Sequence, residues 1–105
     1  MHLEALEIAQ QLGNPDLLFE AVVLSAKVAY HANEIDIAIK TLNDLLRMVQ
    51  GKIEHAAIYY ELYQMMPKEQ RYYQKALELY RELYLEIPQY IFRTRIEELE
   101  KKSSN

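Results

Sequence analysis

The feature of this sequence that most constrains its fold is a regular set of helix-ending residues. Gly13 and Gly51 are the only two glycines, and they lie 38 residues apart. Pro88 follows Gly51 after another 37 residues. Glycine ends helices because it adopts the left-handed conformation freely, and proline cannot continue one because it lacks an N–H. A period of about 38 residues containing two helices is typical of an α-solenoid, in which neighbouring helix pairs bury their faces against one another.

The stretch Gly13-Asn14-Pro15-Asp16 both ends one helix and starts the next. Gly13 supplies the stop, the Asn14 side chain can cap the following helix, and proline suits the first helical turn. Apolar residues recur three and four positions apart on both sides of such signals, and no strand-like alternation competes. The sequence therefore predicts an all-α chain of about six helices, over residues 3–12, 15–32, 35–50, 53–66, 69–86 and 89–101.

Two of these helices have distinctive faces. Helix 15–32 is apolar over much of its circumference, which predicts packing on more than one side. Helix 89–101 has one apolar stripe and one charged face, as a terminal cap requires. In helix 89–101 we expect Phe92, Ile96 and Leu99 to be buried and Glu97, Glu98, Lys101 and Lys102 to face water.

The organisation that follows is a single helical-repeat domain over residues 1–102 with a short tail over 103–105. Pro and Gly are too few for a flexible linker, and 105 residues suffice for one domain. Within this domain we expect a closing helix of a truncated repeat (1–12), a repeat (15–50), a second repeat (53–87) and a capping helix (89–102).

Composition excludes several classes of function. The net charge of -4 argues against nucleic-acid binding, which needs a basic patch. No apolar run approaches the length of about 20 residues that a membrane span needs, and the N-terminal sequence does not resemble a signal peptide. With no cysteine, disulfides and thiolate chemistry are excluded, which suits a reducing compartment. We expect a cytoplasmic protein.

The sequence offers no catalytic, metal-binding or cofactor-binding residues. His2, His31 and His55 lack a second ligand type at metal-site spacing, so we expect surface or packing roles for them. No glycine-rich loop exists to hold phosphate, and Ser25 lies inside an apolar helix, so nucleophilic catalysis has no candidate. We therefore expect a protein that is not an enzyme and uses no cofactor.

Two segments carry a resemblance to the tetratricopeptide repeat (TPR), in the lengthened form found in bacterial regulatory proteins. Residues 21–46, AVVLSAKVAYHANEIDIAIKTLNDLL, resemble one complete repeat, with Ala38 at the closest helix contact. Residues 75–88, KALELYRELYLEIP, resemble the second helix of the next repeat, with Ala76 and Tyr80 on the small and aromatic positions. The chain departs from the family in lacking Trp and Gly in the first helix and in having a longer link over residues 65–74.

The resemblance implies a protein-protein interaction module that binds a peptide or helix of a partner protein in a concave groove. It places helix 3–12 as the end of a repeat that began upstream, which implies a C-terminal fragment of a longer protein. The resulting open apolar face predicts self-association as a homodimer through Leu3, Leu6 and Ile8. Carried over residue by residue, the concave positions fall on Glu20, Val23, Lys27, Tyr30, His31, Tyr60, Tyr63 and Gln64.

Two other functions fit the same pattern. The chain could be an architectural cap and oligomerisation element that binds no ligand, or a sensor arm of a larger signalling or transcription-regulatory protein. Tyr30, Tyr60 and Tyr63 discriminate between peptide binding and the architectural role, because exposed aromatic residues favour the first and packed ones favour the second. Tyr72, Tyr73, Tyr80 and Tyr84 are expected in or beside the core.

Overall fold

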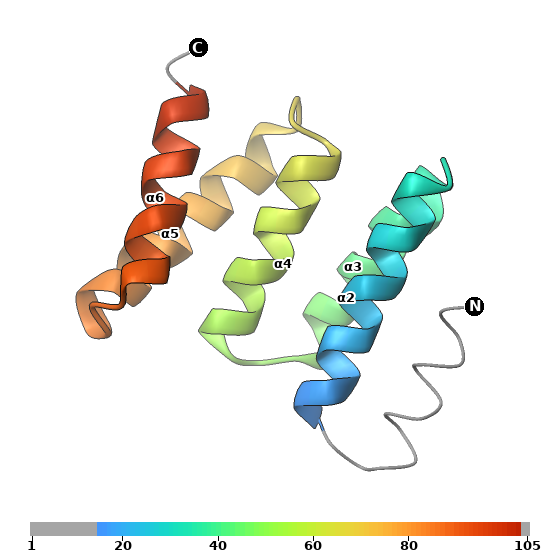
Figure 1. The fold of residues 1–105 in the computed structure, drawn as a ribbon, viewed down its shortest axis with the longest axis horizontal. Coiled ribbons are helices and arrows are strands. Elements are labelled where there is room, and N and C mark those ends of the chain that lie inside the picture. Colours follow the sequence, from blue (N-terminus) through green and yellow to red (C-terminus); the bar gives the residue numbers. More distant parts are fainter. Residues whose placement is uncertain (1–14, 104–105) are drawn as a thin grey trace. The chain divides into compact units, whose positions relative to one another are not determined.

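The computed structural model describes residues 15–103, which form five α-helices and no strand (Figure 1). The all-α prediction is confirmed, and the ends of these five helices lie within two residues of the predicted ones. The helix predicted over residues 3–12 lies outside the described residues. The helices are α2 (Pro15–His31), α3 (Ile35–Met48), α4 (Lys52–Met65), α5 (Gln70–Glu86) and α6 (Tyr90–Ser103).

The chain divides into two compact units. Unit 1 is Met1–Met48 and contains α2 and α3, and unit 2 is Val49–Asn105 and contains α4, α5 and α6. Each unit has buried apolar residues of its own. The boundary lies just before Gly51, one of the helix-ending signals in the sequence. The prediction of one repeat domain over residues 1–102 stays a prediction.

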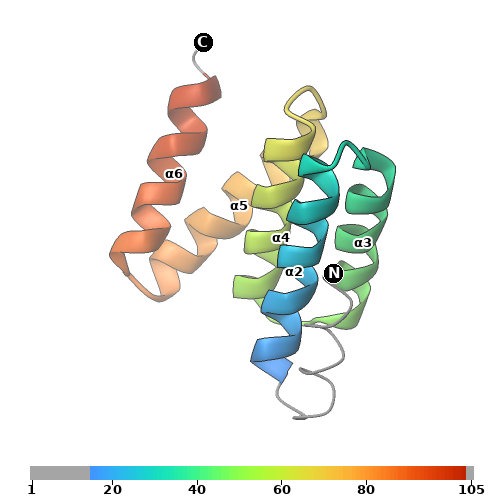
Figure 2. The same ribbon diagram turned by 45° about the vertical axis from the view of Figure 1, so that its right-hand side comes forward.

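Unit 1 is an antiparallel helix pair, with α2 and α3 side by side (Figure 2). On α3 the buried residues Ala38, Leu42 and Leu45 are spaced four and three apart, so they share one face of the helix. The buried residues of α2 are three alanines, and small side chains let two helices approach closely. Leu24 and Val28 on α2 are exposed, which differs from the packing on more than one side that its composition predicted.

The turn between α2 and α3 is closed by backbone hydrogen bonds. The Glu34 N–H donates to the carbonyl oxygen of Ala29 at 2.8 Å, and the Asn33 N–H donates to that of Tyr30 at 3.0 Å. Asn33 has a φ of 66°, in the left-handed region that asparagine tolerates better than most side chains. This conformation at Asn33 ends α2 and lets α3 begin two residues later.

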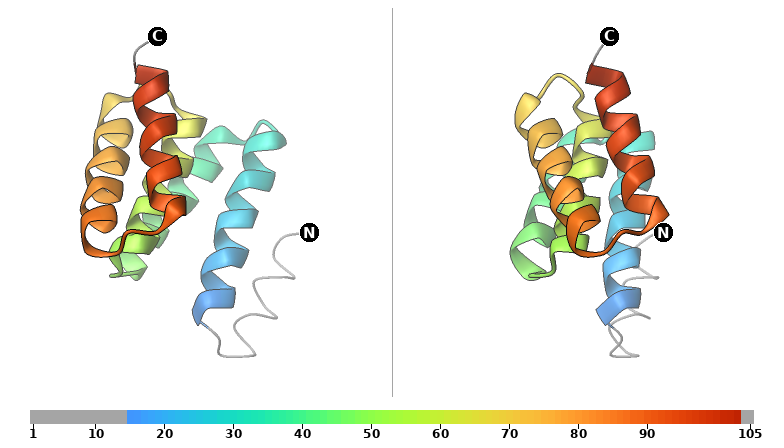
Figure 3. Two further views of the ribbon diagram at one scale, coloured as in Figure 1. Left: turned by 60° about the vertical axis from the view of Figure 1, so that its left-hand side comes forward. Right: turned by 90° about the vertical axis from the view of Figure 1, so that its left-hand side faces the viewer.

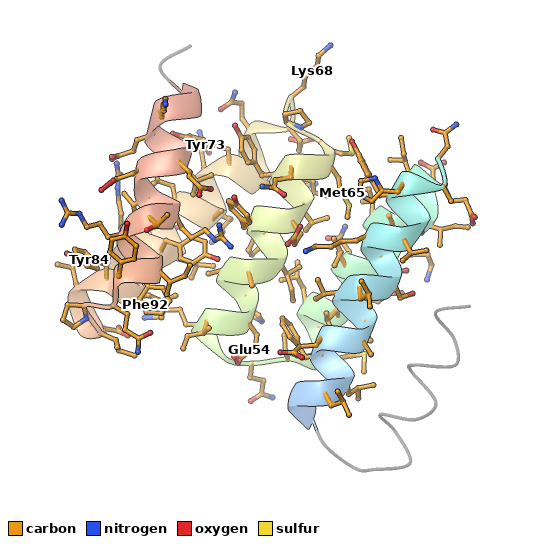
Figure 4. The ribbon with its side chains drawn as sticks, viewed as in Figure 1. Glu54, Met65, Lys68, Tyr73, Tyr84 and Phe92 are labelled. Carbon is orange, nitrogen blue, oxygen red and sulfur yellow. The ribbon has the colours of Figure 1, made fainter. Side chains whose placement is uncertain are left out.

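Unit 2 is a chain of two hairpins, in which α5 packs against α4 on one side and against α6 on another (Figure 3). Helix α4 ends at Met65, shortly before Pro67, and α5 ends at Glu86, shortly before Pro88. Lys68, in the turn between α4 and α5, projects away from the helices (Figure 4). The core is apolar and aromatic, with Ile58, Leu62, Leu83 and Leu99 as its largest fully buried side chains.

Helix α6 is amphipathic, as predicted. Phe92 and Leu99 are buried and Ile96 is half-buried. Arg93, Glu97, Glu100 and Lys101 are exposed on its other side. The prediction for Glu98 differs, because this residue is half-buried and contacts another helix.

Candidate functional site

The five predicted partner-binding residues of unit 1 all lie on α2. Glu20, Lys27 and His31 are exposed, while Val23 and Tyr30 are half-buried. The rings of Tyr30 and His31 meet edge to face, with their centroids 5.6 Å apart. This side of α2 therefore presents three exposed polar side chains and one half-buried aromatic ring.

The three predicted partner-binding residues of unit 2 lie on α4 but differ in environment. Gln64 is exposed, whereas Tyr60 and Tyr63 are each only 7 % exposed. The Tyr63 ring lies beside that of Tyr73, with centroids 5.5 Å apart. Both Tyr60 and Tyr63 are thus part of the core of unit 2 rather than of an open aromatic surface. Tyr72 and Tyr80 are buried and Tyr73 and Tyr84 half-buried, as predicted.

Tyr60 is the centre of a group of four side chains from three helices, which we call the Tyr60 cluster: Tyr60, Tyr80, Arg95 and Glu98. The Tyr60 hydroxyl donates to a Glu98 carboxylate oxygen at 2.5 Å and accepts from Arg95 Nη1 at 3.2 Å. The Arg95 guanidinium also lies over the Tyr60 ring, with its carbon 4.2 Å from the centroid. The cluster therefore links α4 to α6 across α5.

The aromatic members extend this link into the core. The Tyr60 and Tyr80 rings meet edge to face with centroids 6.3 Å apart, and the Phe92 ring follows at 6.2 Å from Tyr80. Arg95 and Glu98 also form an ion pair at 3.5 Å. Within the described residues no buried side-chain nitrogen or oxygen lacks a hydrogen-bond partner. A polar group at the edge of a core is stable under this condition, since its desolvation is then offset.

Sequence reasoning missed Arg95 and Glu98. Their spacing of three residues on α6 indicated that they share a helix face, but an isolated pair of this kind is normally solvated. Only the position of α6 beside α4 and α5 brings them to Tyr60, which is 35 residues from Arg95 and 38 from Glu98. The tyrosines of helix 53–66 were the one available signal, because a tyrosine hydroxyl requires a partner when it is buried.

The environment of Tyr60 keeps its hydroxyl protonated. Burial, together with the hydrogen bond to Glu98, raises the pKa of Tyr60 from 10.0 to about 12, although the charge of Arg95 acts in the opposite direction. Burial also raises the pKa of Tyr80. A group that transfers protons efficiently has a pKa near the working pH. At neutral pH the Tyr60 hydroxyl is therefore a hydrogen-bond donor and not an acid or base for catalysis.

We expect Tyr60 to make stability decrease at alkaline pH. Below pH 10 the hydroxyl is protonated in both the folded and the unfolded chain, so its contribution is complete. Between pH 10 and about 12 only the unfolded chain loses this proton, and the free energy of unfolding falls as pH rises. Urea denaturation of the wild type and Tyr60→Phe across this range should show a stability difference that shrinks with rising pH. If both proteins lost the same stability as pH rises, the effect would not come from Tyr60, because Tyr80 is present in both proteins.

Other polar groups have structural roles. The His55 ring nitrogen Nε2 lies 2.7 Å from the Val49 carbonyl oxygen, which ties the start of unit 2 to α4. Among residues 15–103 no three histidine, cysteine or carboxylate side chains are grouped so that they could hold a metal ion. None of the helices in that range combines the length and apolar character needed to cross a membrane.

Two remaining predictions are not placed by the structure. Leu3, Leu6 and Ile8, the predicted self-association residues, lie outside the described residues, as does His2.

Comparison of the chain with protein-family models, with curated proteins and with solved structures gives no match.

Proposed function

We propose that this chain is a non-catalytic architectural element that supports the assembly of a protein complex through self-association. The observation that carries this proposal is the burial of Tyr60 and Tyr63. A peptide-binding groove uses aromatic residues that are accessible to the ligand. In unit 2 these two residues instead hold α4 against its neighbours, which is what an end piece needs.

The two faces of α6 support the same proposal. Its inner side is anchored by Phe92 and Leu99 in the core and by Arg95 and Glu98 on Tyr60. Its outer side is charged, and the ion pair between Arg93 and Glu97 at 3.1 Å lies there. Helical arrays need such a polar outer face where they stop, because an uncovered apolar face would bind further helices.

We further propose that the helix pairs belong to a TPR-like solenoid of six helices. The period of about 38 residues supports this, as does Ala38, which is fully buried at the small position of the resemblance. We place the protein in the cytoplasm, because it has no cysteine for the disulfides common in secreted domains.

Sedimentation equilibrium tests the architectural proposal directly. We expect the average mass to rise from monomer towards dimer as the concentration increases from about 10 µM to about 1 mM, because an assembly element must associate by mass action. Scattering at the same concentrations should report a matching increase in size. A monomer throughout this range would overturn the proposal.

A second candidate function is peptide binding by α2, and the exposure of Glu20, Lys27 and His31 beside Tyr30 favours it. Peptides selected from a random display library on the wild-type chain would identify such a ligand. Tyr30→Ala should then weaken binding by about tenfold or more, as expected for an aromatic anchor. Tyr90→Ala, which removes an exposed tyrosine from unit 2, is the matched control. Equal affinity of Tyr30→Ala and wild type would eliminate this candidate.

A further inference from the structure

The turn between α5 and α6 carries an exposed apolar group that the core of unit 2 does not use. We call its four large side chains the α5–α6 tip: Leu85, Ile87, Tyr90 and Ile91. Leu85 is 85 % exposed and Tyr90 81 %, while Ile91 is 47 % and Ile87 39 % exposed. Single exposed apolar residues are ordinary, but four within seven consecutive positions concentrate exposed apolar surface around one turn.

The backbone holds these side chains in a defined place. The Ile87 N–H donates to the Leu83 carbonyl oxygen at 2.7 Å, and the Gln89 N–H donates to that of Ile87 at 2.7 Å. The Phe92 N–H then donates to the Gln89 carbonyl oxygen at 3.1 Å. A surface that is already ordered loses less entropy on binding than a flexible loop does.

The charges around the tip indicate what kind of partner fits. Glu82 and Glu86 are paired with Lys52, whose ammonium lies 3.7 and 2.7 Å from their carboxylates. Arg93 is paired with Glu97, and Arg81 with Glu100 at 2.5 Å. These groups carry four negative and three positive charges, so the rim is nearly neutral and offers little to a strongly charged partner. An identical copy would meet only one net negative charge there, which is a small repulsion for a two-fold interface to overcome.

The area of the patch is sufficient for such an interface, but only just. The exposed surface of the four side chains is on the order of 500 Å², within the roughly 300–600 Å² of the largest apolar patch on a typical monomer. Two copies covering each other's tip would together bury about 1,000 Å² of surface, which equals the lower limit for a specific interface. We therefore expect a dissociation constant above about 1 µM, because larger interfaces of about 1,600 Å² already have dissociation constants that range from micromolar to picomolar.

We propose that a second copy of this chain docks on the α5–α6 tip to form a two-fold dimer in which Tyr90 is the main anchor. This inference rests on the proposed assembly function and names the surface and the partner. Tyrosine suits the anchor role because it supplies a large, rigid contact area at low entropic cost. The surface differs from the one predicted around Leu3, Leu6 and Ile8, so the two dimers are distinguishable by mutation.

Sedimentation equilibrium on three variants of the full chain tests the surface. Leu85→Gln/Tyr90→Ser should weaken dimerisation by about tenfold or more, because each variant chain loses the two most exposed of the four tip residues and the interface uses them twice. Leu24→Gln changes a leucine that is 55 % exposed in unit 1 and should leave dimerisation unchanged. Leu3→Gln/Leu6→Gln/Ile8→Gln should also leave it unchanged.

A crosslinking measurement checks the same contact independently. The chain contains no cysteine, so Tyr90→Cys introduces a single thiol that lies near its two-fold equivalent if the tips meet. Mild oxidation should yield covalent dimer of Tyr90→Cys much faster than of Leu24→Cys, which serves as the control. Circular dichroism would verify that the Leu24, Leu85 and Tyr90 variants fold, as expected for changes at exposed positions. The same measurement would check the fold of Leu3→Gln/Leu6→Gln/Ile8→Gln.

The outcomes separate this inference from the function on which it rests. A wild type that stays monomeric would overturn both. A wild type that dimerises while Leu85→Gln/Tyr90→Ser dimerises equally well would overturn only the docking surface. Loss of dimer in the Leu3→Gln/Leu6→Gln/Ile8→Gln variant, with the tip variant unaffected, would assign the interface to the N-terminal segment instead.

Discussion

Replacing Leu62 by alanine is expected to lower the free energy of unfolding of unit 2 by roughly 2–5 kcal/mol. Leu62 lies on α4 and is completely buried. The substitution removes apolar surface from the core and leaves a cavity that the surrounding side chains fill only in part. Its neighbours on α4, Tyr60 and Tyr63, are held by ring contacts with α5, which limits their movement into the space.

Leu85→Ala is the matched control for Leu62→Ala, since it makes the same chemical change at the most exposed large apolar residue described. We expect its effect to stay within about 0.5 kcal/mol when measured at low concentration, where dimerisation does not contribute. Urea denaturation followed by tyrosine fluorescence suits both variants, because Tyr30 is the only tyrosine before Val49. A similar loss in the free energy of unfolding for Leu62→Ala and Leu85→Ala would contradict the described packing.

Replacing Phe92 by alanine is expected to cost roughly 3–5 kcal/mol and to weaken the attachment of α6. Phe92 is buried at the start of α6, where its ring contacts that of Tyr80. Without it, α6 keeps Leu99 and the polar contacts of Arg95 and Glu98 with Tyr60. These polar contacts are partly exposed, and they stabilise the attachment of α6 less than the buried Phe92 ring does, because water competes for their hydrogen bonds.

Hydrogen exchange of the α6 amides would detect this weakening directly. In Phe92→Ala we expect the protection of α6 to fall more than that of α4, since local opening of a terminal helix needs less energy than global unfolding. Tyr90→Ala, two residues away on the same helix, is the control when exchange is measured at low concentration, because Tyr90 is exposed in the monomer and dimerisation does not contribute there. Unchanged protection in Phe92→Ala would show that the polar contacts alone hold α6.

The sequence pattern within a single helix predicted both its buried face and its ends. The burial of Phe92 and Leu99 followed from the spacing of apolar residues on one helix. These are properties of a helix face, and a face is defined by a period of 3.6 residues along a single segment. Helix ends were predictable for the same reason, because glycine, proline and asparagine act on their immediate neighbours.

The candidate site was less predictable because its residues depend on contacts between helices. The spacing on α4 did not reveal that Tyr60 and Tyr63 are buried, since apolar and aromatic residues occupy most of its circumference. The same property of α2 concealed the exposure of Leu24 and Val28. A helix of this kind has no single apolar stripe, so its pattern does not indicate which side meets a neighbour.

The sequence by itself determined that this protein is helical, where its five described helices begin and end to within two residues, and which face of α6 is buried. The tertiary structure alone decided that Glu98 on α6 accepts a hydrogen bond from Tyr60 on α4, and that the α5–α6 tip remains uncovered. The reason is physical: periodicity and helix-ending residues act over one or two turns, whereas a contact across 38 residues exists only once the helices have packed.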